Sequence, residues 1–262
     1  MRLSPLIAAC ALSLPLLSGT AAASSYPVKD RTLTHNKLYR SGPLKPAACM
    51  VDVMRRHFDP PVSKTYGQAV LDCVNSVWAA YAKKAHLPFA KARVTFTFER
   101  RRFCGSPWPE HAAAFYCSAE RRMVILLNRV TVDEPWGLHF LSTITHEYGH
   151  HIQTITGIMR AHDNHPIRGT REQKEQSHRL ELQAECLSGM IMRSMWPALD
   201  STQTEWDDLV DKTKAGAEYY ERTYKINDHG KGRNLAYWLE RGFQTPSPSS
   251  CNTWTAPPAK VA

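Results

Sequence analysis

The sequence feature that most constrains the fold is a pair of histidines, His146 and His150, with three residues between them. Residues four apart lie on the same face of a helix, so both imidazoles can reach one metal ion if this segment is helical. Glu147 completes an H-E-x-x-H pattern, in which the glutamate takes a proton from water that zinc activates. The helical pattern runs from Pro135 onward, and its apolar stripe lies roughly opposite the histidines. That stripe consists of Leu141, Ile144, Tyr148, Ile152 and Ile155.

The pattern is not decisive by itself, because the chain has 12 histidines. Chance gives such a match in about one sequence in forty of this composition, and a surface helix with incidental His and Glu is the alternative. Gly149 weighs against that alternative. Glycine costs about 1 kcal/mol inside a helix, so its presence there predicts a packing reason.

A catalytic zinc ion needs a third protein ligand, and a second long helix over Thr170–Met195 supplies two candidates. Glu181 and Glu185 are one turn apart and border the apolar stripe of that helix. Two carboxylates at a core-facing edge are costly unless they are paired or coordinated. A solvated acidic face is the alternative, and spacing alone does not show which glutamate would bind.

Between residues 93 and 127 the pattern changes to that of strands. Arg93–Arg100 alternates apolar and polar residues, as a half-buried strand does. Two further strands are predicted over Ala113–Cys117 and Met123–Leu127, and residues 101–112 read as a loop. Met123–Leu127 is the candidate edge strand along which an extended substrate could lie.

The remaining segments predict helices and irregular ends. The predicted helices are Ala47–His57, Tyr66–Lys84, Thr204–Tyr224 and Asn234–Arg241, with Pro60–Pro61 separating the first two. Ser24–Pro46 reads as an irregular lead-in, and the Pro- and Ser-rich tail Thr245–Ala262 is predicted to lack regular structure.

Residues 1–23 have the pattern of a secretory signal peptide: a positive start, an apolar run and small residues before a cleavage site after Ala23. A buried N-terminal helix and a lipoprotein signal ending at Cys10 are the alternatives. No later apolar run is long enough to span a bilayer. We therefore expect export to the periplasm or the extracellular space, followed by a single domain over 24–262.

Removal of the signal peptide leaves six cysteines, an even number that suggests disulfides in an exported chain. Their positions suggest the pairs Cys49–Cys73, Cys104–Cys117 and Cys186–Cys251. Six cysteines allow 15 pairings, so this connectivity is a guess. A structural zinc site is the competitor, and no C-x-x-C spacing supports it.

The formal net charge is +9, and the basic residues are scattered, without a run interleaved with aromatics. Nucleic-acid binding is therefore not predicted. Attraction to acidic substrates or anionic envelope polymers is compatible with this charge, and a solvated surface is the simpler interpretation.

The combined motifs resemble the bacterial "putative neutral zinc metallopeptidase" family. The resemblance covers roughly Phe103 to Trp254 and rests on the segments Thr145–Gln153, Leu180–Gly189 and His229–Gly230, with Trp238 and Cys251, and on Cys104–Gly105 and Phe115–Cys117 upstream. That family is similar to CAAX-prenyl-protease and HtpX-type metallopeptidases, which have an E-x-x-A-D segment. The resemblance implies that Glu181 is the third zinc ligand and that Glu185 orients a ligand histidine. Here Glu185 replaces the usual Asp, so ligation by Glu185 itself stays open.

His229 matches the late His-Gly of the family, and we expect it to hydrogen-bond the tetrahedral oxyanion. An ordinary surface histidine is the alternative. The family usually has an arginine six residues further on, but this chain has Leu235 there and its nearest arginine is Arg233.

Together these features predict an α+β, zincin-like metallopeptidase fold that is mostly helical, with a small antiparallel or mixed sheet and stabilising disulfides. The expected function is hydrolysis of peptide bonds in a peptide or protein substrate, with one zinc ion and with Glu147 as the general base. An inactive zinc-containing binding protein of the cell envelope is the alternative, and a disulfide-stabilised exported protein without metal is a third reading. The sequence does not indicate the oligomeric state.

Overall fold

The computed structural model describes residues 26–49, 51, 59–128 and 138–262. The predicted signal peptide, most of the predicted helix Ala47–His57 and the expected helix start at Pro135 lie outside these residues. Among the described helices, none combines the length and the apolar character that a membrane span requires.

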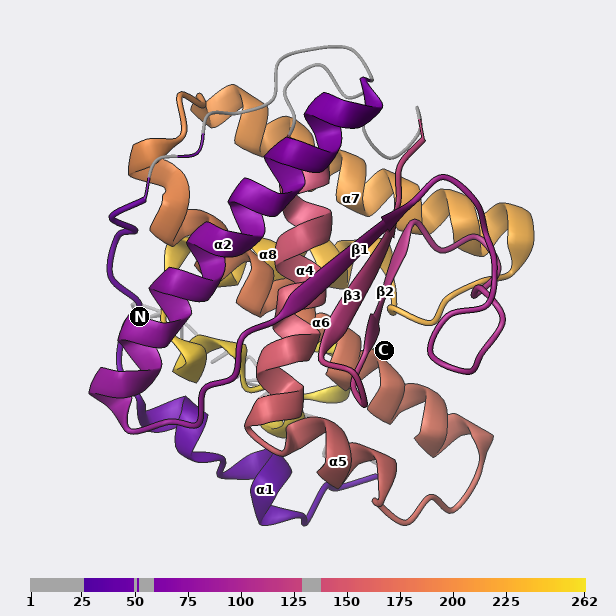
Figure 1. The fold of residues 1–262 in the computed structure, drawn as a ribbon. Helices are drawn as coiled ribbons and strands as arrows, with labels where there is room; N and C mark the ends of the chain where they lie inside the picture. The colour runs from indigo at the N-terminus through magenta and orange to yellow at the C-terminus, as the bar shows by residue number, and fades with distance from the viewer. Residues whose placement is uncertain (1–25, 50, 52–58, 129–137) are drawn as a thin grey trace, which may run out of the picture.

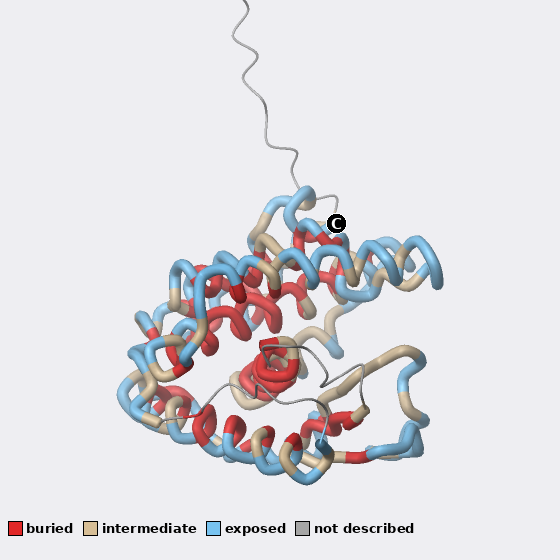
Figure 2. The backbone as a smooth tube through the Cα atoms, turned by 90° about the horizontal axis from the view of Figure 1, so that it is seen from above, coloured by how far each residue is buried: buried red, intermediate tan, exposed pale blue. Residues whose placement is uncertain are grey.

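The fold is built in three layers around one central helix, α4 (Leu138–Ile155). On one side of α4 lie α2 (Pro60–Ala85) and a small sheet. On the other side lie α6 (Thr170–Met195), α7 (Gln203–Tyr224) and α8 (Gly232–Gln244). Viewed along its axis, α4 is enclosed by both layers and is mostly buried (Figures 1 and 2). This arrangement confirms the predicted α+β class.

The sheet has three strands, β1 (Arg93–Thr97), β2 (Ala114–Cys117) and β3 (Arg122–Leu126). Their order is β1-β3-β2, with β1 parallel and β2 antiparallel to β3. The prediction that Met123–Leu127 forms an edge strand is wrong, because β3 lies in the middle. Its continuous apolar run is buried on both faces, as in a central strand, and does not alternate as a half-buried edge strand would.

The predicted apolar stripe of α4 anchors it in the core. Leu141, Ile144, Tyr148 and Ile152 are fully buried. Removal of this apolar surface from water is the main contribution that holds the helix in place. The opposite face, with the histidines, is thereby fixed toward α6.

Helix α2 starts six residues before its predicted start. Asp59 caps it, since its side chain accepts a hydrogen bond from the Val62 amide. Pro60 and Pro61, which we expected to separate two helices, form the first turn instead. Proline fits there because the first helical amides have no partner within the helix. His86 ends the helix in a left-handed conformation with φ of 53°.

The other helices agree with the sequence to different degrees. Helix α6 has the predicted bounds, α7 begins one residue earlier at a capping box of Thr202 and Glu205, and α8 extends past both predicted ends. The lead-in is less irregular than expected, since it contains the short helix α1 (Arg31–Thr34) and a 3-10 turn at Lys37–Arg40. A further short helix, α5 (Ile158–Asp163), had no clear sequence signal.

The C-terminal tail is compact, contrary to the prediction that it lacks regular structure. It forms 3-10 turns at Pro248–Cys251, Thr253–Thr255 and Pro258–Lys260. The buried guanidinium of Arg179 on α6 donates to the carbonyl oxygens of Thr253 and Ala256. These contacts fasten the backbone of the tail to α6, so the tail packs without long regular elements.

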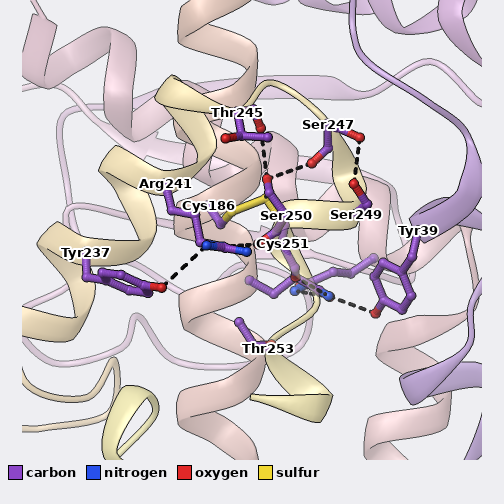
Figure 3. The surroundings of a disulfide bond; sticks show 12 residues. Tyr39, Cys186, Tyr237, Arg241, Thr245, Ser247, Ser249, Ser250, Cys251 and Thr253 are labelled. Atoms are coloured by element: carbon purple, nitrogen blue, oxygen red, sulfur yellow. Dashed lines mark hydrogen bonds between the residues drawn. A yellow bond between two sulfur atoms is a disulfide. The ribbon is translucent and has the colours of Figure 1, made fainter. Parts of the chain in front are cut away.

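Three disulfides join the suggested cysteine pairs, Cys49–Cys73, Cys104–Cys117 and Cys186–Cys251. Their Cα–Cα distances of 5.7, 6.1 and 5.4 Å lie in the usual range for a disulfide. The third bridge fastens the C-terminal tail to α6, next to hydrogen bonds from Arg241 and Ser250 (Figure 3).

Gly149 is where α4 and α6 come into backbone contact. A Cβ atom at this position would lie 2.7 Å from the carbonyl oxygen and 2.8 Å from the Cα atom of Ala184. Both distances are shorter than van der Waals contact allows, and the atoms that would have to move are backbone. This close contact explains why a glycine stands inside α4.

We expect Gly149→Ala to lower the free energy of unfolding by about 1–3 kcal/mol, the usual effect of overpacking a core. It should also weaken zinc binding, because the added methyl group separates the helices that hold the histidines and the glutamates. Urea unfolding and zinc titration measure the two effects. The control is Gly216→Ala on α7, where an added Cβ meets nothing within 4 Å. If both variants show the same unfolding free energy and zinc affinity, the close α4–α6 contact does not control stability or zinc binding.

His151 on α4 is buried and joins the helix to the sheet layer. Its Nε2 atom lies 2.8 Å from the carbonyl oxygen of Ala90, so Nε2 donates. Its Nδ1 atom then accepts from the Tyr116 hydroxyl of β2 at 2.8 Å. Burial lowers the pKa of His151 to about 4, so the ring is neutral near neutral pH.

Because the pKa of His151 is lower in the folded chain, the unfolded chain takes up a proton first as the pH falls. Stability from this group is present above pH 6.5 and is lost between about pH 6.5 and 4, up to about 3 kcal/mol. His151→Gln should reduce the loss of unfolding free energy between pH 7 and 4 by about that amount. Urea unfolding at both pH values, with a chelator present, measures it. An equal loss in both proteins would show that His151 does not titrate in this way.

Candidate metal centre

Three imidazoles converge on one carboxylate oxygen, Glu181 Oε2 of α6. The Nε2 atoms of His146 and His150 on α4 lie 3.4 and 3.2 Å from it. His229, between α7 and α8, places its Nε2 atom 3.2 Å from the same oxygen. The fold thus brings together all four side chains that the sequence proposed for the metal and the oxyanion.

These distances fit a zinc site. In a tetrahedron with bonds of about 2.0–2.1 Å, the ligand atoms are about 3.3–3.4 Å apart, which is close to the separation of Glu181 Oε2 from each histidine Nε2. His146, Glu181 and His229 have ligand atoms within 4.8 Å of one another, and His150 is not part of that set. Glu181 Oε2 is buried, and no hydrogen bond of good geometry reaches it from the described residues. Imidazole and carboxylate donors suit zinc. A buried carboxylate oxygen surrounded by nitrogen atoms but without a hydrogen bond is therefore explained by a cation between them.

The outer nitrogen atoms of both α4 histidines have buried partners. His146 Nδ1 lies 2.8 Å from Glu185 Oε2, and His150 Nδ1 lies 2.9 Å from Gln153 Oε1. Gln153 in turn donates to the carbonyl oxygen of Leu180 at 2.7 Å. Both acceptors take the proton on Nδ1, so Nε2 is the ring atom of each histidine that faces Glu181 and is available to a metal.

The geometry separates the two glutamates that sequence spacing left equivalent. Glu181 faces the Nε2 atoms, whereas Glu185 contacts His146 on the opposite edge of its ring. Gln153 was not among the candidate residues. Its position three residues after His150, on the same helix face, is the signal that could have found it.

Glu147 lies buried beside the cluster. Its Oε2 atom has no hydrogen-bond partner in the part of the chain that the structure describes. Burial raises the pKa of Glu147, and the nearby His150 and His146 oppose that rise. A carboxylate with a raised pKa and a free oxygen is suited to take up and return a proton near neutral pH.

The charges in the cluster compensate one another. Burial alone would raise the pKa of Glu181, but attraction to His150 and His229 holds it well below its usual range. Burial alone would lower the pKa of His146, but its contacts with Glu181 and Glu185 raise it well above its usual range. Glu181 is therefore an anion that attracts positive charge to this point of the molecule.

His229 differs from the other donors in its support. Its side chain is 46% exposed, and its Nδ1 atom lies 3.5 Å from Asp228 Oδ1. The backbone next to it turns at Gly230, with φ of 86°. Two residues before His229, the carbonyl oxygen of Asn227 lies 2.7 Å from the Nε2 atom of His178 on α6.

The position at which an arginine is expected is apolar here. Leu235 is buried in the core, and Arg233 is exposed. Among the described residues, no contact places the positive charge of Arg233 at the cluster.

A pocket of about 400 Å³ opens between α6 and the segment before His229. Ser177 lies one helical turn before Glu181 and Asp228 directly precedes His229, so the pocket begins beside the cluster. Its lining residues are Thr170, Gln173, Lys174, Ser177, Ile226, Asn227 and Asp228.

We expect Glu185→Ala to weaken zinc binding by about 10- to 100-fold, the usual effect of removing the outer partner of a ligand histidine. The reason is that His146 would lose the group that fixes its tautomer and orientation. Competition with a chromophoric chelator measures the affinity. Glu240→Ala, an exposed carboxylate on α8, is the control. An unchanged affinity in Glu185→Ala would show that this contact does not support the site.

Comparison with known proteins agrees with this geometry. A family model described as "Putative neutral zinc metallopeptidase" matches residues 59–254. The uncharacterized protein YpfJ of Escherichia coli strain K12 is 28% identical over 159 residues, which is 53% of each chain. The uncharacterized proteins Mb2605 of Mycobacterium bovis and Rv2575 of Mycobacterium tuberculosis are each 23% identical over 182 residues, 58% of each chain. The chain therefore spans little more than half the length of these relatives. No solved structure matches it.

Proposed function

Because the chain belongs to the family described as "Putative neutral zinc metallopeptidase", we propose that it is a zinc-dependent endopeptidase that hydrolyses peptide bonds. His146, His150 and Glu181 would hold the ion, and Glu147 is the general base. One zinc ion per chain, and a peptide or protein as the substrate, follow from this assignment.

The observation that carries the proposal is the position of Glu147. A purely structural zinc site has no use for a buried carboxylate whose free oxygen lies beside the ligands. Such a group destabilises the fold, because burial of a polar atom without a hydrogen bond costs about 1–3 kcal/mol. A role as proton acceptor gives the residue a reason to be there.

The reaction follows from these groups. Zinc, when bound, supplies a Lewis acid for the scissile carbonyl and makes water acidic enough to ionise near neutral pH. Glu147 takes one proton from the attacking water as its oxygen bonds to the carbonyl carbon. His229 donates a hydrogen bond to the developing oxyanion. Glu147 then gives the proton to the amide nitrogen, and the C–N bond breaks to release an amine and a carboxylic acid, whose remaining proton is lost to the amine or to water.

Strand β2 replaces Met123–Leu127 as the candidate for substrate pairing. In the described part of the sheet, β2 pairs with β3 on one side and with no strand on the other. Its Tyr116 contacts His151, the residue after the ligand candidate His150, so β2 packs against α4 close in sequence to the cluster. An extended peptide added there would pass next to the cluster. The pocket beside Ser177 would then receive one substrate side chain.

Export through the N-terminal segment 1–23, to the periplasm or beyond the cell, remains part of the proposal. Three disulfides are compatible with an oxidising compartment. The scattered basic residues give no reason to propose a nucleic-acid partner.

The second candidate function is an inactive zinc-containing binding protein of the cell envelope. It is favoured by one observation, the imidazole of His229, which adds a fourth donor and could close the metal to water. The free oxygen of Glu147 favours the endopeptidase. The two candidates differ in whether an external ligand can reach the metal.

We expect Glu147→Gln to retain zinc and to lower the hydrolysis rate at least about 100-fold, the smaller end of the range for general acid–base catalysis. The amide keeps the size of the side chain but cannot accept the proton. Casein hydrolysis and elemental analysis of the purified protein measure the two properties.

Glu175→Gln on α6, where the carboxylate is paired with Arg179 away from the cluster, is the control for loss of a partly buried carboxylate. If Glu147→Gln hydrolyses casein as fast as the unaltered protein does, the proposed mechanism is wrong. If the unaltered protein holds zinc but cleaves no peptide in a library, the binding-protein alternative is correct.

A further inference from the structure

We propose that His229 is a fourth, displaceable zinc ligand, which closes the metal centre in the resting protein and leaves it when substrate binds. The inference rests on the proposed function, since it concerns the same metal. It assigns His229 a role in controlling access to the site, in addition to the hydrogen bond to the oxyanion.

The first argument is the position of the His229 ring. Its Nε2 atom is as close to Glu181 Oε2 as that of His150, at 3.2 Å, and closer than that of His146, at 3.4 Å. One ligating atom each from His146, Glu181 and His229 can lie within 4.8 Å of the other two. An oxyanion donor needs to lie beside the site, whereas His229 lies at the separation of a ligand.

The second argument is the arrangement of four donors. A hydrolytic zinc site has three protein ligands and keeps the fourth position for water or substrate. With His229 in place, three histidine Nε2 atoms lie 3.2–3.4 Å from Glu181 Oε2, so the chain offers one donor more than a hydrolytic site uses. Of these histidines, His146 and His229 have ligand atoms within 4.8 Å of each other and of Glu181, and His150 is not part of that set. Hydrolysis therefore requires that one donor leave.

The third argument is that His229 is the donor held most weakly. The side chains of His146 and His150 are 13% and 10% exposed, and both rings are fixed from behind by buried acceptors. The side chain of His229 is 46% exposed, and its partner, Asp228, is 69% exposed and 3.5 Å away. An ion pair so exposed to water contributes little.

The backbone around His229 also favours its release. The residue lies between two helices, and Gly230 turns the chain in the left-handed region where glycine is unstrained. The other three donors lie on α4 and α6, whose backbones are in contact at Gly149. Movement of His229 thus leaves the remaining ligands in place, and the displaced ring can donate to the oxyanion once its Nε2 atom has taken up a proton from water.

The first test uses cobalt(II) in place of zinc, because the energy and intensity of its visible d–d bands change when a nitrogen ligand is exchanged for water. We expect His229→Ala to differ from the unaltered protein in the position and intensity of these bands. Zinc affinity, measured by chelator competition, should fall at least about tenfold. That is the smaller effect seen when a group hydrogen-bonded to a ligand histidine is removed.

The second test adds acetohydroxamate, a small bidentate zinc ligand. If His229 must leave before the ligand binds, the apparent affinity is reduced by the fraction of open sites. His229→Ala should therefore bind acetohydroxamate at least about tenfold more tightly than the unaltered protein, which corresponds to a resting site open a tenth of the time. An oxyanion donor that never ligates predicts equal or weaker binding in the variant.

His165→Ala, which removes a histidine outside the cluster, is the control and should match the unaltered protein in every measurement. Thermal unfolding of the metal-free proteins checks that His229→Ala is folded. An unchanged cobalt spectrum or an unchanged acetohydroxamate affinity in His229→Ala overturns the inference.

These outcomes are separate from those that decide the proposed function. If Glu147→Gln is inactive but His229→Ala leaves the cobalt spectrum unchanged, the endopeptidase stands and only the fourth ligand is wrong. If neither zinc nor cobalt binds the unaltered protein, both proposals fail together.

Discussion

The contact between α4 and α6 at Gly149 and Ala184 is the constraint on which the rest of the structure depends. It sets the two helices close enough for side chains only one turn away to meet. His150 follows Gly149 directly, and Glu181 and Glu185 lie three residues before and one residue after Ala184. The side chains of the cluster are long enough to converge only because the backbones touch. Burial of the apolar stripe on the other side of α4 holds this contact closed.

The orientation of the histidine and glutamate side chains in the cluster depends on hydrogen bonds between residues that are far apart in the sequence. Gln153, which fixes His150, also lies 3.2 Å from the side-chain oxygen of Gln183. Gln183 donates to the Tyr39 hydroxyl and to the carbonyl oxygen of Cys251, beside the disulfide with Cys186 (Figure 3). The N-terminal lead-in and the C-terminal tail thus meet at the back of α6. Because unsatisfied groups there would be costly, the network specifies one orientation of the helix that holds Glu181.

The sequence predicted the long helices, and the proximity of His146, His150 and Glu181, from local spacing. The turn between His146 and His150 and the periodicity of Thr170–Met195 depend on few residues. What it could not give were features set by distant partners. The apolar run Met123–Leu127 is compatible with an edge or a central strand, and only its two neighbours decide. The tail is irregular in pattern, yet Arg179, some seventy residues earlier, organises it. Likewise, His229 and Glu181 lie on separate elements, so no periodicity in the sequence predicts that they meet.

Under the proposed hydrolytic function, the division between helix-borne and loop-borne groups has a physical reason. Groups that must hold a metal throughout turnover belong on elements whose movement would disrupt the core, and His146, His150 and Glu181 satisfy this on α4 and α6. A group that must face first the resting site and then a tetrahedral intermediate needs freedom that a buried helix does not have. His229, half exposed and beside a glycine turn, has it. Its weak support is therefore no defect of the site, since a rigid fourth donor in the same place would keep substrate from the metal.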